Sequence, residues 1–185
     1  MAVQSRAGMV QTVSGLVRPG ELGVTLTHEH LMSDAGVLAP PPPQATLRDM
    51  HAWPASLEAF AYSRHYSDAV HNLEDLTLRD VSTAIDEVML YKQLGGDSMV
   101  EATSIGLGRD PVALARISRA TGVNIIMGAS YYVATSHPPD MDDISEDAIA
   151  EGIVRDVTEG ADGTGIRSGV IGEVGCSWPL AENER

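Results

Sequence analysis

Basic residues are scarce in this chain, where 12 Lys and Arg stand against 26 Asp and Glu and give a formal net charge of -14. A strongly acidic surface repels phosphate groups, so the composition argues against nucleic acids and anionic membrane surfaces as partners. Cysteine is scarcer still. Cys176 stands alone, which excludes an internal disulfide and a cysteine-based zinc cluster.

Long apolar runs are also lacking. No stretch approaches the roughly 20 apolar residues that a membrane-spanning helix needs. The first six residues, Met1–Arg6, lack the apolar core of a signal peptide. We therefore expect a reducing, cytoplasmic setting.

The chain does have enough apolar residues to fold. It contains 185 residues, of which 43% are hydrophobic and 21% charged, as is typical of a globular domain. We expect a flexible tail over residues 1–9 and a single folded unit over residues 10–185. A small hairpin over Val10–Val17 is expected to precede the main fold.

Strand and helix signals alternate along the rest of the chain. Apolar runs predict core strands at residues 22–27, 98–103, 123–127 and 169–174. Between them, capping residues and apolar stripes predict helices that begin at Thr77, Asp110 and Ser145, with glycines after their last turns. This alternation indicates a parallel sheet with helical crossovers.

A doubly wound sheet and a (β/α)8 barrel both fit this order. A doubly wound sheet normally carries a glycine-rich phosphate turn after its first strand. Here that position holds His28-Glu29-His30. The barrel is therefore favoured, and the fold class is predicted to be α/β, of the (β/α)8 TIM-barrel type, with roughly the first four βα units present.

Residues 32–76 interrupt the alternation. The proline run at residues 40–43 cannot be helical, and aromatic residues cluster at Trp53, Phe60, Tyr62 and Tyr66. We expect a structured covering loop with short helices, in which the aromatics mainly pack.

Three residues could hold a metal ion at the mouth of such a barrel. In an extended strand the side-chain period is two, so His28 and His30 project from one face. Glu173 lies at the end of the fourth expected strand, and barrel strand ends meet at one mouth. Two imidazoles and a carboxylate are ordinary ligands of zinc. A lone His-x-His pair is more often structural, and a lone Glu173 could equally pair with a basic residue.

The other candidate ligands are given ordinary roles. Glu29 is expected to make a structural contact, and Cys176 receives no role. The acidic stretch over residues 140–162 is expected to be a solvated helix face, because it lacks the spacing of a calcium loop. Solvated positions are also expected for the remaining histidines: His51, His65, His71 and His137.

Several segments together resemble the phosphotriesterase family of the amidohydrolase superfamily, and most closely its phosphotriesterase-related branch. They are the stretches Thr25-Leu-Thr-His-Glu-His-Leu31 and Gly169-Val-Ile-Gly-Glu-Val-Gly-Cys-Ser-Trp-Pro-Leu180, with Val10–Val13 and glycine turns near residues 95, 106 and 160. The resemblance runs from about Val10 to Arg185.

The resemblance implies a barrel with a binuclear metal centre, usually of zinc. His28 and His30 match ligands of the more buried ion, and Glu173 matches the carboxylate that bridges the two. Family members hydrolyse esters, lactones or amides, and the branch is associated with N-acetyltaurine and similar N-acyl amides. The implied partner is therefore a small-molecule substrate, and a homo-oligomer is a further expectation.

This chain departs from the family pattern in its length. A barrel of this type needs roughly 250 residues. The family takes two more histidines and a proton-transferring aspartate from its second half, so we expect an N-terminal half and assign no catalytic residue within it. The alternative is a truncated, non-catalytic half-barrel that binds metal weakly or pairs with a partner.

Overall fold

A parallel three-stranded sheet forms the centre of the fold, in the order β3-β6-β7. The computed structural model describes residues 6–65 and 74–185. The strands are β3 (Thr25–Glu29), β6 (Ser98–Glu101) and β7 (Asn124–Met127). Neighbours along the chain are neighbours in the sheet, as in the first units of a (β/α)8 barrel, so the expected α/β class is confirmed.

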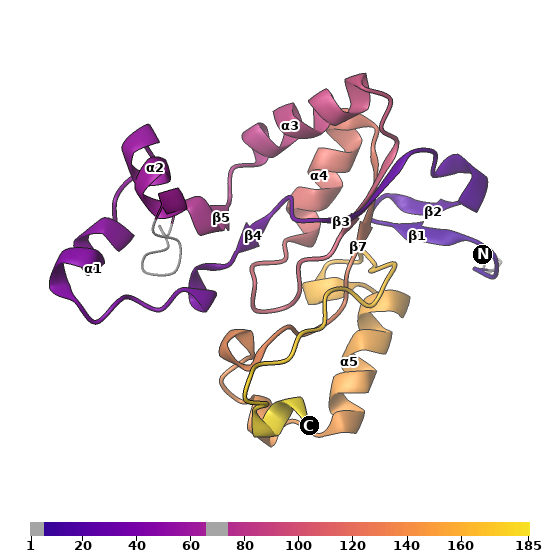
Figure 1. The fold of residues 1–185 in the computed structure, drawn as a ribbon. Coiled ribbons are helices and arrows are strands. Elements are labelled where there is room, and N and C mark those ends of the chain that lie inside the picture. The colour runs from indigo at the N-terminus through magenta and orange to yellow at the C-terminus, as the bar shows by residue number, and fades with distance from the viewer. Residues whose placement is uncertain (1–5, 66–73) are drawn as a thin grey trace.

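Three long helices connect or follow these strands: α3 (Val81–Gln93), α4 (Pro111–Thr121) and α5 (Glu146–Thr158). Figure 1 shows α3 and α4 packed beside each other, while α5 lies apart from them near the C-terminus. Two predicted caps are present, since the Asp110 side chain accepts a hydrogen bond from the Ala113 amide and Ser145 accepts one from Ala148.

The predicted start of α3 at Thr77 is wrong by about one turn. Asp80 is the N-cap, and its carboxylate accepts a hydrogen bond from the Thr83 amide at 2.6 Å. Thr77 lies instead in β5 (Thr77–Leu78), a short strand that pairs with β4 (Ser33–Asp34). An aspartate is at least as strong an N-cap as a threonine. The helix begins after Asp80 because Thr77 and Leu78, which come before it, are extended in β5.

The fourth predicted strand, over residues 169–174, is not a regular strand. Val170 forms a single parallel bridge with Gly128 at the end of β7. The Gly169 amide donates to the Met127 carbonyl, and the Ala129 amide donates to the Val170 carbonyl. The segment therefore lies beside β7 in the expected order, but its ladder is too short to count as a strand.

The N-terminal hairpin is confirmed as β1 (Val10–Thr12) and β2 (Gly15–Val17), which pair antiparallel. It is fastened to the sheet because the Val13 amide donates to the Ile125 carbonyl at 2.8 Å. Of the predicted tail, residues 1–5 lie outside the described residues.

The long excursion contains short helices, as expected: α1 (Ala45–His51) and α2 (Leu57–His65). They lie to one side of the sheet in Figure 1. The rings of Trp53 and Tyr62 meet edge to face at 6.1 Å, so these two aromatics do contact each other. Short 3-10 turns occur at Pro19–Glu21, Gly36–Leu38, Glu74–Leu76, Ala134–Ser136, Met141–Asp143, Ala161–Gly163 and Glu182–Glu184.

The hydrophobic core lies between the sheet and the two packed helices. Its most buried members come from α4 and β7: Leu114, Ile117, Ile125 and Met127. Val88 adds the contribution of α3. Burying each of these side chains contributes roughly 1.5–3 kcal/mol, which fixes the helices against the strands that carry the site residues.

A buried ion pair ties α5 to the sheet, and it makes Asp156 an exception in an acidic stretch that is otherwise largely exposed, as expected. The Arg109 side chain is only 1% exposed and pairs with Asp156 on α5 and with Asp162, both at 2.8 Å. It also donates to the Gly128 carbonyl at 3.1 Å. Asp156 is buried because a buried guanidinium needs compensating charge, whereas Asp162 pairs with the same guanidinium and stays 45% exposed.

Replacing Arg109 should therefore unfold this part of the molecule more readily. Arg109→Met keeps an unbranched apolar side chain but leaves Asp156 buried without its cation, and a loss of about 3 kcal/mol in the free energy of unfolding is expected. Arg109→Lys keeps the positive charge but not the planar guanidinium that binds two acids at once, so its free energy of unfolding should fall by less. Urea unfolding measures both, and a loss below about 1 kcal/mol for the methionine variant would contradict the account.

Candidate metal centre

The two histidines of the candidate site stand at the end of β3. The strand ends at Glu29 rather than at the expected Thr27, so His28 lies within it and His30 follows directly after it. The pairing of β3 with β6 shifts register between Leu26 and Glu29, so β3 has one extra residue there. Such bulges re-aim side chains near functional sites.

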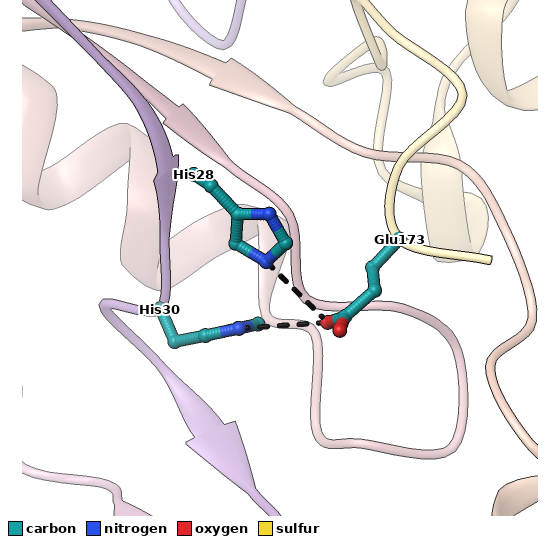
Figure 2. A group of neighbouring side chains, drawn as sticks. All are labelled: His28, His30 and Glu173. Atoms are coloured by element: carbon teal, nitrogen blue, oxygen red, sulfur yellow. Dashed lines mark ion pairs between the residues drawn. The ribbon is translucent and has the colours of Figure 1, made fainter. Parts of the chain in front are cut away.

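The structure brings His28, His30 and Glu173 together. Glu173 Oε2 lies 3.7 Å from His28 Nε2 and 3.5 Å from His30 Nε2. Figure 2 shows both rings directed at this carboxylate from β3, with the acid reaching across from the C-terminal segment. The side chains are 57%, 35% and 21% exposed in the order His28, His30, Glu173, so the group is open to solvent on one side.

Glu173 reaches the histidines because the chain passes very close to β7. A Cβ atom added to Gly172 would lie 2.9 Å from Gly128 Cα and 3.0 Å from the Ala102 carbonyl oxygen. The Glu173 amide donates to that same Ala102 oxygen at 3.2 Å, and Ser130 Oγ donates to the Glu173 carbonyl. Residues without side chains at both 128 and 172 thus allow the approach that places the carboxylate.

The geometry of this group suits a metal ion. One ligand atom from each of the three residues can be chosen so that all lie within 4.8 Å of one another. Two ligands bound to zinc at about 2.1 Å with a tetrahedral angle stand about 3.4 Å apart, close to the distances between Glu173 Oε2 and the two Nε2 atoms. Imidazole nitrogen and carboxylate oxygen are also the donor types that zinc prefers.

Two buried polar residues that the sequence analysis did not single out lie behind His30. The ring nitrogen Nδ1 of His30 is 2.9 Å from Thr103 Oγ1, and that hydroxyl donates to Glu101 Oε1 at 2.5 Å. Both Thr103 and Glu101 are fully buried. The signal was present in the sequence, since a glutamate and a threonine interrupt an apolar strand at residues 98–103.

Burial dominates the ionisation of Glu101. Loss of solvent raises its pKa to about 7, although hydrogen bonds from Thr103 and from the Leu31 amide pull the pKa down. Oxygen Oε2 of this carboxyl group has no hydrogen-bond partner among the described residues.

A cavity of about 310 Å³ adjoins His30 and Glu173. The paired strands β4 and β5 bring the ends of the long excursion against the loop after β6, where the Asp34 amide donates to the Leu107 carbonyl. The lining is mainly apolar and consists of His30, Ser33, Ala35, Leu38, Leu76, Leu78, Leu107, Tyr132 and Glu173. Two of the three candidate ligands thus form part of its wall.

The other candidate residues lie outside this group. His51 is buried, so the expectation that it is solvated is wrong; it closes α1 within the folded excursion. His65 is exposed on α2, and His137 donates through Nε2 to the Tyr132 carbonyl. His71 lies outside the described residues, and Cys176 is exposed.

Parallel strands with histidines and an acid at their carboxyl ends form the arrangement in which (β/α)8 enzymes build their active sites. The family model that describes the phosphotriesterase family matches residues 8–185. The chain belongs to the phosphotriesterase family.

Three relatives show how far the similarity extends. The N-acetyltaurine hydrolase of Homo sapiens is 41% identical over 189 residues, a match that covers 99% of this chain and 52% of that protein. A resiniferatoxin-binding protein from Rhodobacter sphaeroides shares 40% identity and a TM-score of 0.89, over 97% of this chain and 49% of the other. A variant of a PTE-like lactonase from Deinococcus radiodurans shares 27% identity and a TM-score of 0.60, over 88% and 44%.

The chain therefore spans about half the length of the curated relatives that it matches. Within the described residues, no helix combines the length and the apolar character that crossing a membrane requires.

The close approach at Gly172 generates a first prediction for the site. Gly172→Ala should push the Glu173 segment away from β7 and lower the affinity for Zn²⁺ by about 10-fold. This is the lower end of the loss seen when residues that support metal ligands are changed. Competition with a chromophoric chelator measures this affinity. Gly20→Ala is the matched control, because a Cβ at Gly20 meets nothing within 4 Å. Equal affinities for the two variants would contradict the account.

The burial of Glu101 generates a second prediction, about pH. The folded protein holds a proton on Glu101 up to about pH 7, whereas the unfolded chain releases it near the ordinary glutamate pKa of 4.5. Between these values the folded state binds more protons, so the contribution of this group to the free energy of unfolding falls as pH rises. Glu101→Gln removes that loss.

The corresponding measurement is urea unfolding of metal-free protein at pH 4.5 and pH 8. The stability of Glu101→Gln relative to the unsubstituted protein should rise by about 3 kcal/mol between these two pH values. A relative stability that does not change with pH would show that Glu101 ionises normally in the folded protein.

Proposed function

We propose that this chain forms part of a metal-dependent hydrolase that acts on an amide, ester or lactone bond. The observation that carries the proposal is the group of His28, His30 and Glu173 beside a cavity lined mainly by apolar side chains. Membership of the phosphotriesterase family supports it, as does the name of the human relative, N-acetyltaurine hydrolase.

The three residues are assigned as metal ligands. His28 and His30 would hold a first ion, and Glu173 would be shared between it and a second. We propose two divalent ions, with zinc as the preferred metal because the donors are nitrogen and carboxylate oxygen. Such ions supply Lewis acidity, which makes water nucleophilic near neutral pH and polarises a carbonyl group.

The residues of this chain bind and orient the reacting groups. The leucines at positions 38, 76, 78 and 107 line the cavity next to His30 and Glu173, so a short acyl chain would be held there with its carbonyl toward the ligands. Water is displaced from the apolar side, which strengthens electrostatic interactions at the site. N-acyl amides of the N-acetyltaurine type are the first substrates to test.

We also propose a cytoplasmic setting and a homo-oligomer. Nucleic acids and anionic membranes are not expected as partners, because the net charge of -14 would repel their phosphate groups.

The test uses the protein produced from its complete reading frame. Metal content and hydrolysis of N-acetyltaurine, a simple lactone and an aryl phosphotriester are measured before and after chelation. We expect amide or lactone turnover that is abolished by the chelator and restored by Zn²⁺. His28→Asn and Glu173→Gln should each lower Zn²⁺ affinity more than about 100-fold, beyond the usual effect of changing a residue behind a ligand.

His65→Asn is the matched control, because His65 is exposed on α2 away from the group. It should retain both zinc and turnover. Protein that binds no metal, or whose turnover survives complete chelation, would contradict the proposal. Metal binding without any turnover would favour the non-catalytic alternative.

A further inference from the structure

Behind the candidate ligands runs a short chain of hydrogen bonds that starts at His30. Thr103 Oγ1 lies 2.9 Å from His30 Nδ1, and Thr103 is fully buried. The same hydroxyl donates to Glu101 Oε1. The Leu31 amide also donates to Glu101 Oε1, at 3.2 Å, so Glu101 holds the backbone that follows His30 as well.

The direction of these bonds decides which nitrogen of His30 carries the proton. A threonine hydroxyl has one hydrogen, and here that hydrogen is given to Glu101. Toward His30 the hydroxyl oxygen can then only accept, so Nδ1 of the neutral ring is the protonated nitrogen. Nε2 is left with its lone pair, and Nε2 is the atom that lies 3.5 Å from Glu173 Oε2.

We propose that Thr103 and Glu101 are positioning residues, which fix the tautomer and the orientation of His30 so that Nε2 is ready to bind a divalent metal ion. The inference rests on the proposed function only in that His30 is taken as a ligand. Histidine ligands commonly donate their second ring nitrogen to a carboxylate or another acceptor, which orients the ring and makes it a better donor. Here the acceptor is the Thr103 hydroxyl, which donates in turn to Glu101 Oε1.

The free-energy cost of burying Glu101 indicates that this residue does more than fill space in the core. Glu101 is fully buried in a strand that is otherwise largely apolar, and burying a carboxyl group is expensive unless it is well bonded. One of its oxygens, Oε2, has no partner among the described residues. An apolar side chain would fill this position at lower cost but would give Thr103 no acceptor, and the hydroxyl could then turn its hydrogen toward His30.

The decisive variants change the Thr103 hydroxyl. Thr103→Val keeps the shape and removes the hydroxyl, and Thr103→Ser keeps the hydroxyl. In the protein produced from its complete reading frame, Zn²⁺ affinity is measured by competition with a chromophoric chelator. The valine variant should bind about 10- to 100-fold more weakly, and the serine variant should stay within about 3-fold of the unsubstituted protein.

A second readout reports on the ligands directly. The visible absorption of the Co²⁺-substituted protein depends on the donors around the ion, so Thr103→Val should change this spectrum and Thr103→Ser should preserve it. Glu101→Gln retains an acceptor oxygen but loses the charge, and its affinity should fall between those of the serine and valine variants.

Thr121→Val is the matched control, because Thr121 is also buried and its hydroxyl binds the Ile117 carbonyl and the Val123 amide at the end of α4. It should lose stability without losing zinc. If Thr103→Val does not fold, Thr103→Ala carries the same prediction.

Two failures are distinguishable. If the unsubstituted protein binds no metal, the proposed function fails and this inference fails with it. If the unsubstituted protein binds zinc and a folded variant without the Thr103 hydroxyl binds it equally tightly with an unchanged Co²⁺ spectrum, the positioning role alone is overturned.

Discussion

The placement of one carboxylate determines whether this molecule has a metal site. Glu173 belongs to a segment that makes only a single bridge to β7, yet it reaches the two histidines of β3 on the far side of β6. The close passage of Gly172 over Gly128 makes this reach feasible, and the bond from the Glu173 amide to Ala102 holds it. The approach of the two backbone segments therefore sets the positions of the three side chains relative to one another.

Buried polar contacts hold the same end of the sheet. Thr103 and Glu101 link β6 to His30, while Arg109, a few residues further on, binds acids from α5 and beyond it. Each contact brings charge or a polar group out of water, which is costly unless every partner is present. These contacts hold the end of the sheet that carries His30, beside the apolar cavity.

Local signals in the sequence predicted much of the fold. Asp110 and Ser145 act as caps through bonds that span three residues, so the sequence around them is sufficient. The strand order follows from alternation, and His28 with His30 follows from the period of a strand. Local signals do not always locate the first residue of a helix. Thr77 and Asp80 both suit a helix N-terminus, and the sequence alone does not show that α3 begins after Asp80.

Contacts between distant residues could not be predicted in the same way. Asp156 belongs to a stretch that is acidic throughout, and nothing near it in sequence reveals that Arg109 will bury it. His51 is buried by a fold of the long excursion that has no repeating pattern. Glu101 reaches His30 only through the Thr103 hydroxyl, and the sequence does not show that these three residues meet.

Whether His28, His30 and Glu173 hold zinc can be tested with a crystal structure of the zinc-loaded protein and anomalous diffraction at the zinc edge. We expect an anomalous peak about 2.1 Å from Nε2 of His28 and His30 and within bonding distance of Glu173. Zinc held elsewhere, with these three side chains uncoordinated, would contradict their assignment as ligands.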